Sequence, residues 1–125
     1  MAETFRSVPQ MFLARVAKTP DREAYLQPDG AGWKAFTWRE VGEKVKAIAC
    51  GLRSLGLADE ERGAILSSTR LDWILADLGI LSAGGATTTI YPSSTTPDCL
   101  FILKDSGARV LFAEHREQAD RIAAR

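Results

Sequence analysis

The sequence predicts an α/β fold in which an N-terminal helix and a small hairpin precede a βαβαβα series with a parallel sheet. Three observations predict it. Residues that start helices, Ser7 and Thr37, each precede a run with helical apolar spacing. A stretch rich in Pro and Gly at 28–32 separates two short strand-like runs. Short apolar or β-branched runs then alternate with helical patterns, which is typical of strands that pair in parallel.

The first two expected elements are a helix and a hairpin. The helix begins after Ser7, has Pro9 in its first turn and ends near Thr19 and Pro20. The hairpin has short strands on either side of a loop whose composition reverses a chain. We expect the strands at 23–27 and 33–36 and the loop at 28–32.

A second helix is expected from Thr37 onward. Thr37 and Glu40 have the spacing of a capping box, in which each side chain accepts a hydrogen bond from a backbone N–H of the other residue. Gly56 is placed to end the helix, because Gly tolerates the left-handed conformation found there. Five apolar residues share one face and are expected to pack in the core: Val41, Val45, Ile48, Leu52 and Leu55.

The rest of the chain predicts the parallel sheet. Helices cover both faces of such a sheet, and right-handed crossovers leave few topologies for a series of this kind. No internal repeat or linker interrupts it. The expected strands lie at 63–67, 86–90 and 109–113, and the expected helices at 70–83, 97–104 and 117–125.

The helical stretch 73–81, which opens on Trp73 and closes on Leu81, is apolar nearly all round. Asp72, just before the stretch, and Asp77, within it, are the main polar interruptions of this helix. Such a helix needs cover on two sides, and a three-strand sheet supplies one. We therefore expect the rest of a larger domain to cover the other side. The last run, 117–125, carries no helix stop signal, which favours the same interpretation.

Composition excludes several classes of function. The chain has 16 Lys plus Arg and 16 Asp plus Glu, so no basic field favours binding to nucleic acid. Its longest apolar stretch is far shorter than the roughly 20 residues of a membrane-spanning helix, and the start does not resemble a signal peptide. We expect a cytoplasmic protein. Cys50 and Cys99 have no metal-binding spacing and are expected to be ordinary reduced cysteines.

Two motifs resemble those of the adenylate-forming superfamily. Residues 36–41, FTWREV, resemble its first core motif, in which Thr or Ser, an aromatic residue and Glu open a helix. Residues 65–95 resemble its second, a helix that ends at Ala-Gly and a strand that leads to Pro. The resemblance runs from Phe5 through nearly the whole chain.

The second motif separates branches of that superfamily. Its TTTIYPSS form is similar to AMP-forming long-chain acyl-CoA ligases, whereas amino-acid-activating relatives have a strand closer to AYVPLDP. Departures fall in turns: Glu61 and Arg62 stand where the family has Gly-Asp, and Thr69 stands where Asn is frequent.

The resemblance implies an N-terminal fragment of a long-chain fatty-acid–CoA ligase, with residues 1–125 forming an incomplete portion of the large adenylation domain, truncated before the phosphate loop. The complete enzyme would use ATP and Mg²⁺ to form an acyl-adenylate from a fatty acid. It would then transfer the acyl group to coenzyme A. Since the family's phosphate loop and catalytic Lys cannot be located here, we assign no catalytic, cofactor-binding or metal-binding residue and expect this chain alone to be inactive.

Tyr91 and Pro92 are the substrate-binding candidates, because they follow a parallel strand at the edge where open α/β sheets bind ligands. A simple turn is the other interpretation. The hydroxyl-rich run 93–96 lacks the glycines of a phosphate loop and predicts a turn. Gly84 and Gly85 predict a helix end with close packing. His115 predicts a surface residue at a helix start.

Two alternatives remain at this point. The chain could be a short protein that docks through the uncovered helix at 73–81 with a separately encoded remainder. It could also belong to a fatty-acyl-AMP ligase, which hands its acyl group to a carrier protein. For the complete enzyme, a peripheral contact with a membrane is an alternative to a purely cytoplasmic location.

Overall fold

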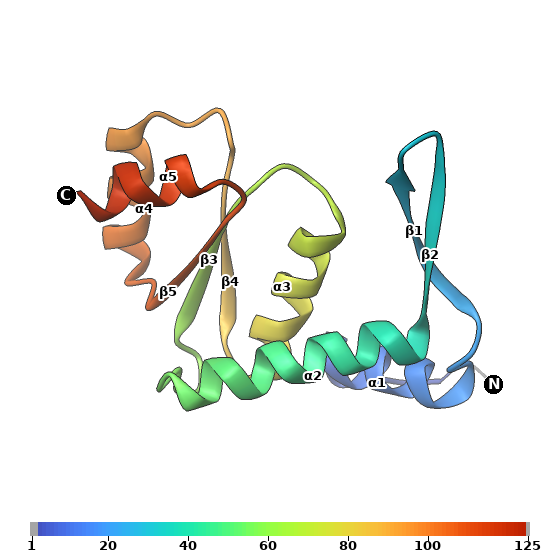
Figure 1. Ribbon diagram of the computed structural model, residues 1–125. Coiled ribbons are helices and arrows are strands. Elements are labelled where there is room, and N and C mark those ends of the chain that lie inside the picture. The colour runs from blue at the N-terminus through green and yellow to red at the C-terminus, as the bar shows by residue number, and fades with distance from the viewer. Residues whose placement is uncertain (1–2, 125) are drawn as a thin grey trace.

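The computed structural model describes residues 3–124 and confirms the predicted order of elements (Figure 1). A helix and a hairpin come first, and strands alternate with helices from the second helix onward. The helices are α1 (Val8–Lys18), α2 (Trp38–Ser54), α3 (Leu71–Ser82), α4 (Thr96–Ser106) and α5 (Arg116–Ala123). The strands are β1 (Glu23–Asp29), β2 (Gly32–Thr37), β3 (Arg62–Leu66), β4 (Ala86–Ile90) and β5 (Val110–Ala113).

The hairpin is longer than the sequence predicts. β1 and β2 pair antiparallel until Asp29 faces Gly32, so Pro28 and Asp29 belong to a strand and not to the loop. Gly30 turns the chain with φ +59°. Proline is tolerated in β1 because this sheet has only two strands, so each strand leaves one side without backbone partners.

The three remaining strands form the predicted parallel sheet in the order β4-β3-β5. The central strand β3 is almost wholly buried, as its apolar sequence requires. Successive side chains alternate between the faces: Ala64 and Leu66 pack with Cys99 of α4, and Ile65 packs with Ile80 of α3. Helices α4 and α5 therefore cover one face and α3 the other (Figure 1).

Helix α3 packs on two sides within this chain, while Trp73, Ile74 and Leu81 stay partly exposed. Cover of the stretch from Trp73 to Leu81 by the rest of a larger domain stays a prediction. Leu75 and Leu78 of this helix pack with Val41 and Val45 of α2 and with Phe12 of α1. Its opposite side packs on β3. The helices approach closely at Gly79, where an added Cβ would collide with Ile48 of α2. Nothing in the sequence pattern indicates that α2 lies across α3 (Figure 1).

The ends of α2 and α5 refine two further predictions. The Thr37 and Glu40 capping box is present, and Gly56 has φ +96° after the last turn of α2, as predicted. Leu55, however, is 77% exposed, and Leu57 takes the expected place in the core. α5 begins at Arg116, one residue before the predicted start, and Arg125 lies outside the described residues.

Candidate functional site

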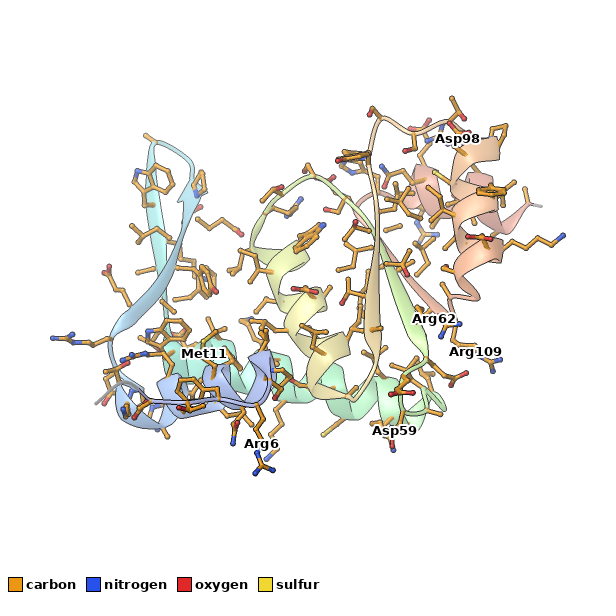
Figure 2. The ribbon with its side chains drawn as sticks, turned by 180° about the vertical axis from the view of Figure 1, so that it is seen from behind. Arg6, Met11, Asp59, Arg62, Asp98 and Arg109 are labelled. Atoms are coloured by element: carbon orange, nitrogen blue, oxygen red, sulfur yellow. The ribbon has the colours of Figure 1, made fainter. Side chains whose placement is uncertain are left out.

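The three parallel strands deliver three loops to one edge of the sheet. Open α/β sheets bind ligands beyond the carboxyl ends of their strands, so this edge is the candidate site. Residues 67–70 follow β3, a turn that begins at Tyr91 follows β4, and Glu114 follows β5. In Figure 2, Asp98 in the first turn of α4 marks this edge, and Arg62 and Arg109 mark the opposite one.

Glu114 connects two of these loops. Its backbone N–H donates to the carbonyl oxygen of Leu66 at 3.0 Å, which continues the pairing of β5 with β3. Its carboxylate accepts from the backbone N–H of Ser68 at 3.0 Å and from the Ser68 hydroxyl at 2.9 Å. Arg70 donates to the same carboxylate at 3.3 Å. The side chain is only 12% exposed, so these donors take the place of water.

These donors change the proton affinity of the carboxyl group. The backbone N–H and hydroxyl of Ser68, followed by Arg70 and His115, lower the pKa of Glu114 from 4.5 to about 2, against partial desolvation. Arg70 also forms an ion pair with Asp72 at 3.1 Å. The cluster therefore holds its anionic carboxylate at all physiological pH values.

The loop at 67–70 forms a wall shared by three hollows. A hairpin hollow of about 520 Å³ lies between this loop, β1 residues 25–28 and Ile74 of α3. A strand hollow of about 360 Å³ lies between Arg70, Trp73 and β5 residues 111–113. A turn hollow of about 530 Å³ is lined by residues 67–69, Trp73, Tyr91 and Pro92.

Tyr91 and Pro92, the substrate-binding candidates, thus line the turn hollow together with residues of the β3–α3 loop. Tyr91 is 81% exposed, and its carbonyl oxygen accepts from the backbone N–H of Ser94 at 3.0 Å, which closes a turn. The side chain could contact a ligand at this edge, and the binding role stays a prediction.

The alternative sites have the structural roles that the sequence predicts. In the run 93–96, Thr95 caps α4 by accepting from the backbone N–H of Asp98 at 3.3 Å. An added Cβ on Gly85 would lie 2.9 Å from the carbonyl oxygen of Glu61, so the prediction of close packing is confirmed. His115 precedes α5 with a side chain that is 65% exposed, as expected for a surface residue at a helix start.

The two cysteines are both free thiols. Cys50 is exposed and Cys99 is buried, and burial is the main factor that raises the pKa of the Cys99 thiol. Within residues 3–124, no group of three or more His, Cys, Asp or Glu side chains could hold a metal ion. None of the helices described here is long and apolar enough to cross a membrane.

Sequence reasoning missed the cluster of Ser68, Arg70 and Glu114. The signal was present, because Ser68 and Arg70 follow one predicted strand and Glu114 follows another, and parallel strands end at a common edge. It was passed over because 46 residues separate Ser68 from Glu114 and no local motif links them.

Comparison with models of protein families shows to which family this chain belongs. Residues 12–125 match the family model described as "AMP-binding enzyme". The chain belongs to this AMP-binding family. The match covers both core motifs on which the sequence-based resemblance rests, and it confirms that resemblance at the level of the adenylate-forming superfamily.

Relatives of this AMP-binding chain include both fatty-acid and peptide enzymes. It is 36% identical over 104 residues to the long-chain-fatty-acid–CoA ligase FadD15 of Mycobacterium bovis. This alignment covers 83% of this chain and 17% of that ligase. The chain is 32% identical over 114 residues to surfactin synthase subunit 1 of Bacillus subtilis. This alignment covers 91% of this chain and 3% of that protein.

A solved relative shows the fold. The fatty acyl-adenylate ligase from L. pneumophila, crystallised with acyl adenylate and pyrophosphate, superposes with a TM-score of 0.83 at 21% identity. The superposition covers 94% of this chain and 21% of that ligase. The α/β fold described above therefore corresponds to one part of a larger adenylate-forming enzyme.

Proposed function

We propose that this chain is the N-terminal part of the adenylation domain of a long-chain fatty-acid–CoA ligase. The observation that carries the proposal is the 36% identity with FadD15 of Mycobacterium bovis over 104 residues. The TTTIYPSS sequence at 87–94, which resembles the long-chain ligases, supports the same branch. The match with surfactin synthase subunit 1 supports the superfamily and leaves the fatty-acid branch to experiment.

In the complete enzyme, the fatty-acid carboxylate would attack the α-phosphorus of ATP, with Mg²⁺ bound to the phosphates. Acyl-adenylate would form and pyrophosphate would leave. The thiol of coenzyme A would then attack the acyl carbon, giving acyl-CoA and AMP. The 125 residues hold no Gly, Ser and Thr-rich phosphate loop with a Lys, so we assign this chain a scaffold role with Tyr91 and Pro92 facing substrate.

A fatty-acyl-AMP ligase is the second candidate. Its support is that a solved enzyme of this class, the L. pneumophila fatty acyl-adenylate ligase, shares the fold over 94% of this chain. In such an enzyme the acyl group would pass to a carrier protein. The docking alternative stays a third candidate: α2 and α1 cover one side of the helix through which it would act, and Trp73, Ile74 and Leu81 remain partly exposed.

For the complete enzyme we propose a cytoplasmic location, where ATP and coenzyme A are available. Peripheral contact with a membrane is the alternative, since a long-chain fatty acid partitions into a bilayer. Fractionation of cells that express the complete enzyme distinguishes the two: recovery in the washed membrane pellet would contradict a purely cytoplasmic location.

The proposal is tested with a chimera. Residues of this chain replace the matching 104-residue segment of FadD15. A matched control chimera receives the corresponding segment of surfactin synthase subunit 1. We expect the first chimera to form acyl-CoA from a long-chain fatty acid, ATP and coenzyme A, and the control to lose most of this activity.

Two outcomes would contradict the proposal. Equal activity in both chimeras would mean that the segment carries no relationship to the fatty-acid branch. A folded but inactive first chimera would mean that this segment does not fit a fatty-acid–CoA ligase. If the chimera accumulates acyl-adenylate and passes its acyl group to a carrier protein instead of coenzyme A, with release of AMP, the fatty-acyl-AMP ligase is favoured.

A further inference from the structure

We propose that Glu114 is a positioning residue that holds the loop at 67–70 in place at the carboxyl edge of the sheet. This inference deepens the proposed function, on which it rests for the identity of the ligand that the edge binds. The contact of Glu114 with the loop is observed in this structure and does not depend on the proposed function. The loop borders all three hollows, so the residue that fixes the loop also fixes their shapes.

The loop needs such a support because it lies between two regular elements. β3 ends at Leu66 and α3 begins at Leu71, so residues 67–70 lie outside the ladder and the helix. Arg70 occupies the N-cap position of α3, and its side chain forms no capping hydrogen bond. The backbone N–H of Ser68 instead finds its acceptor on Glu114, which the neighbouring strand β5 delivers.

A carboxylate suits this position better than an amide. Both carboxylate oxygens accept hydrogen bonds: Oε2 from the Ser68 backbone N–H at 3.0 Å, and Oε1 from the Ser68 hydroxyl at 2.9 Å and from Arg70 at 3.3 Å. A glutamine would keep one acceptor oxygen and present N–H donors where the other now accepts. The Gln variant therefore keeps the size of the side chain and loses at least one of these bonds.

The surrounding charges favour the anion. Arg70 lies on one side of the carboxylate, and His115 Nε2 lies 3.9 Å from its Oε1. Asp72 forms an ion pair with Arg70 from the first turn of α3, so it draws part of the guanidinium charge away from Glu114. Arg70 thereby connects the start of α3 to β5, and the loop is held at two points.

The experiment uses residues 1–125 and nuclear magnetic resonance. We compare the wild type with Glu114→Gln and with the control Glu43→Gln, which changes an exposed glutamate on α2. We expect hydrogen exchange at the Ser68 amide to accelerate at least about tenfold in Glu114→Gln, because a hydrogen bond to a charged group is lost. The control should leave it unchanged. Resonances of Trp73 and Tyr91, which line the turn hollow, should shift in Glu114→Gln only.

A second measurement needs no variant, so it holds even if Glu114→Gln folds poorly. In the wild type, the Ser68 amide proton shift should follow the titration of the Glu114 carboxyl group as the pH falls. A side chain that merely fills space would leave that proton insensitive to pH. An unchanged exchange rate at Ser68 in a folded Glu114→Gln, or a Ser68 shift independent of this titration, would overturn the proposal. Neither readout uses catalytic activity, so failure here is distinct from failure of the chimera.

Discussion

Glu114 is the residue whose environment differs most from what its position in the sequence suggests. It follows β5 and precedes an exposed histidine, a context typical of a solvated charge. The structure places it beside Ser68 and Arg70, which come from a loop 44 to 46 residues earlier. Local patterns carry no information on such a contact. Only the common edge of parallel strands could have indicated it.

The lowered pKa of Glu114 makes the stability of the protein depend on pH. The folded-state pKa of about 2 lies below the ordinary value of 4.5, so the stabilisation by this carboxylate is fully present above about pH 4.5. It is lost as the pH falls through the folded-state pKa. We therefore expect the free-energy difference between the wild type and Glu114→Gln to narrow as the pH falls from about 4.5 towards about 2.

Urea unfolding at several pH values measures this difference. The Glu43→Gln variant serves as the control, and its difference from the wild type should change little over the same range. A gap between the wild type and Glu114→Gln that stays constant or widens towards low pH would show that the Glu114 carboxylate is not stabilised by its donors.

Two glycines in helices are expected to respond oppositely to alanine. Alanine improves helix propensity by about 1 kcal/mol. At Gly51 of α2 an added Cβ meets nothing within 4 Å, so Gly51→Ala should stabilise the chain by up to about 1 kcal/mol. At Gly79 of α3 the Cβ would lie 2.9 Å from Ile48 Cβ and collide with Ile48 Cγ2. Overpacking of about 1–3 kcal/mol should outweigh the propensity gain.

Thermal and urea unfolding of the two variants provide the test. The glycines act as controls for each other, since both lie within helices and gain the same methyl group. If Gly79→Ala were as stable as Gly51→Ala, the close approach of α2 and α3 would be incorrect.

At the scale of elements, the sequence predicted helices and strands wherever a terminal signal accompanied the periodicity. Ser7 and Thr37 accept the expected hydrogen bonds from backbone N–H groups, and Gly56 adopts the expected left-handed conformation. The predictions were wrong where they relied on residue composition alone, without information on strand pairing. Pro28 and Asp29 suggest a loop, yet an isolated two-strand ribbon has room for proline, because each strand has an unpaired side.

Leu55 shows a different reason for error. It continues the apolar face of α2, but the helix ends at Ser54 and the chain reverses at Gly56. The core is then reached by Leu57, which is buried. Helical periodicity cannot indicate how far along a helix the rest of the protein extends, so the last turn was wrongly assigned to the core.

The capping box of α2 gives the prediction at this scale. Thr37 Oγ1 accepts from the backbone N–H of Glu40 at 3.2 Å, and Glu40 Oε1 accepts from the backbone N–H of Thr37 at 3.3 Å. Thr37→Ala should destabilise the chain by about 1 kcal/mol in urea unfolding. Thr37→Ser keeps the hydroxyl group and should retain most of the stability. An equal loss in both variants would assign the effect to the lost methyl group instead.

At the scale of the molecule, the sequence predicted the parallel sheet and the family, and it misjudged how the layers meet. The helix at 73–81, apolar nearly all round, correctly indicated burial on two sides. Periodicity does not reveal which neighbour supplies each side. α2 crosses α3 and supplies the side opposite β3 (Figure 1).

We propose that this chain supplies scaffold and part of a substrate edge to an adenylate-forming enzyme whose chemistry lies in other residues. The most direct test is ATP–pyrophosphate exchange in the presence of Mg²⁺ and a long-chain fatty acid, measured on the purified chain and on its chimera with FadD15. We predict exchange by the chimera and none above background by the chain. Fatty-acid-dependent exchange by the purified chain would contradict the account, because these residues would then carry out adenylation themselves.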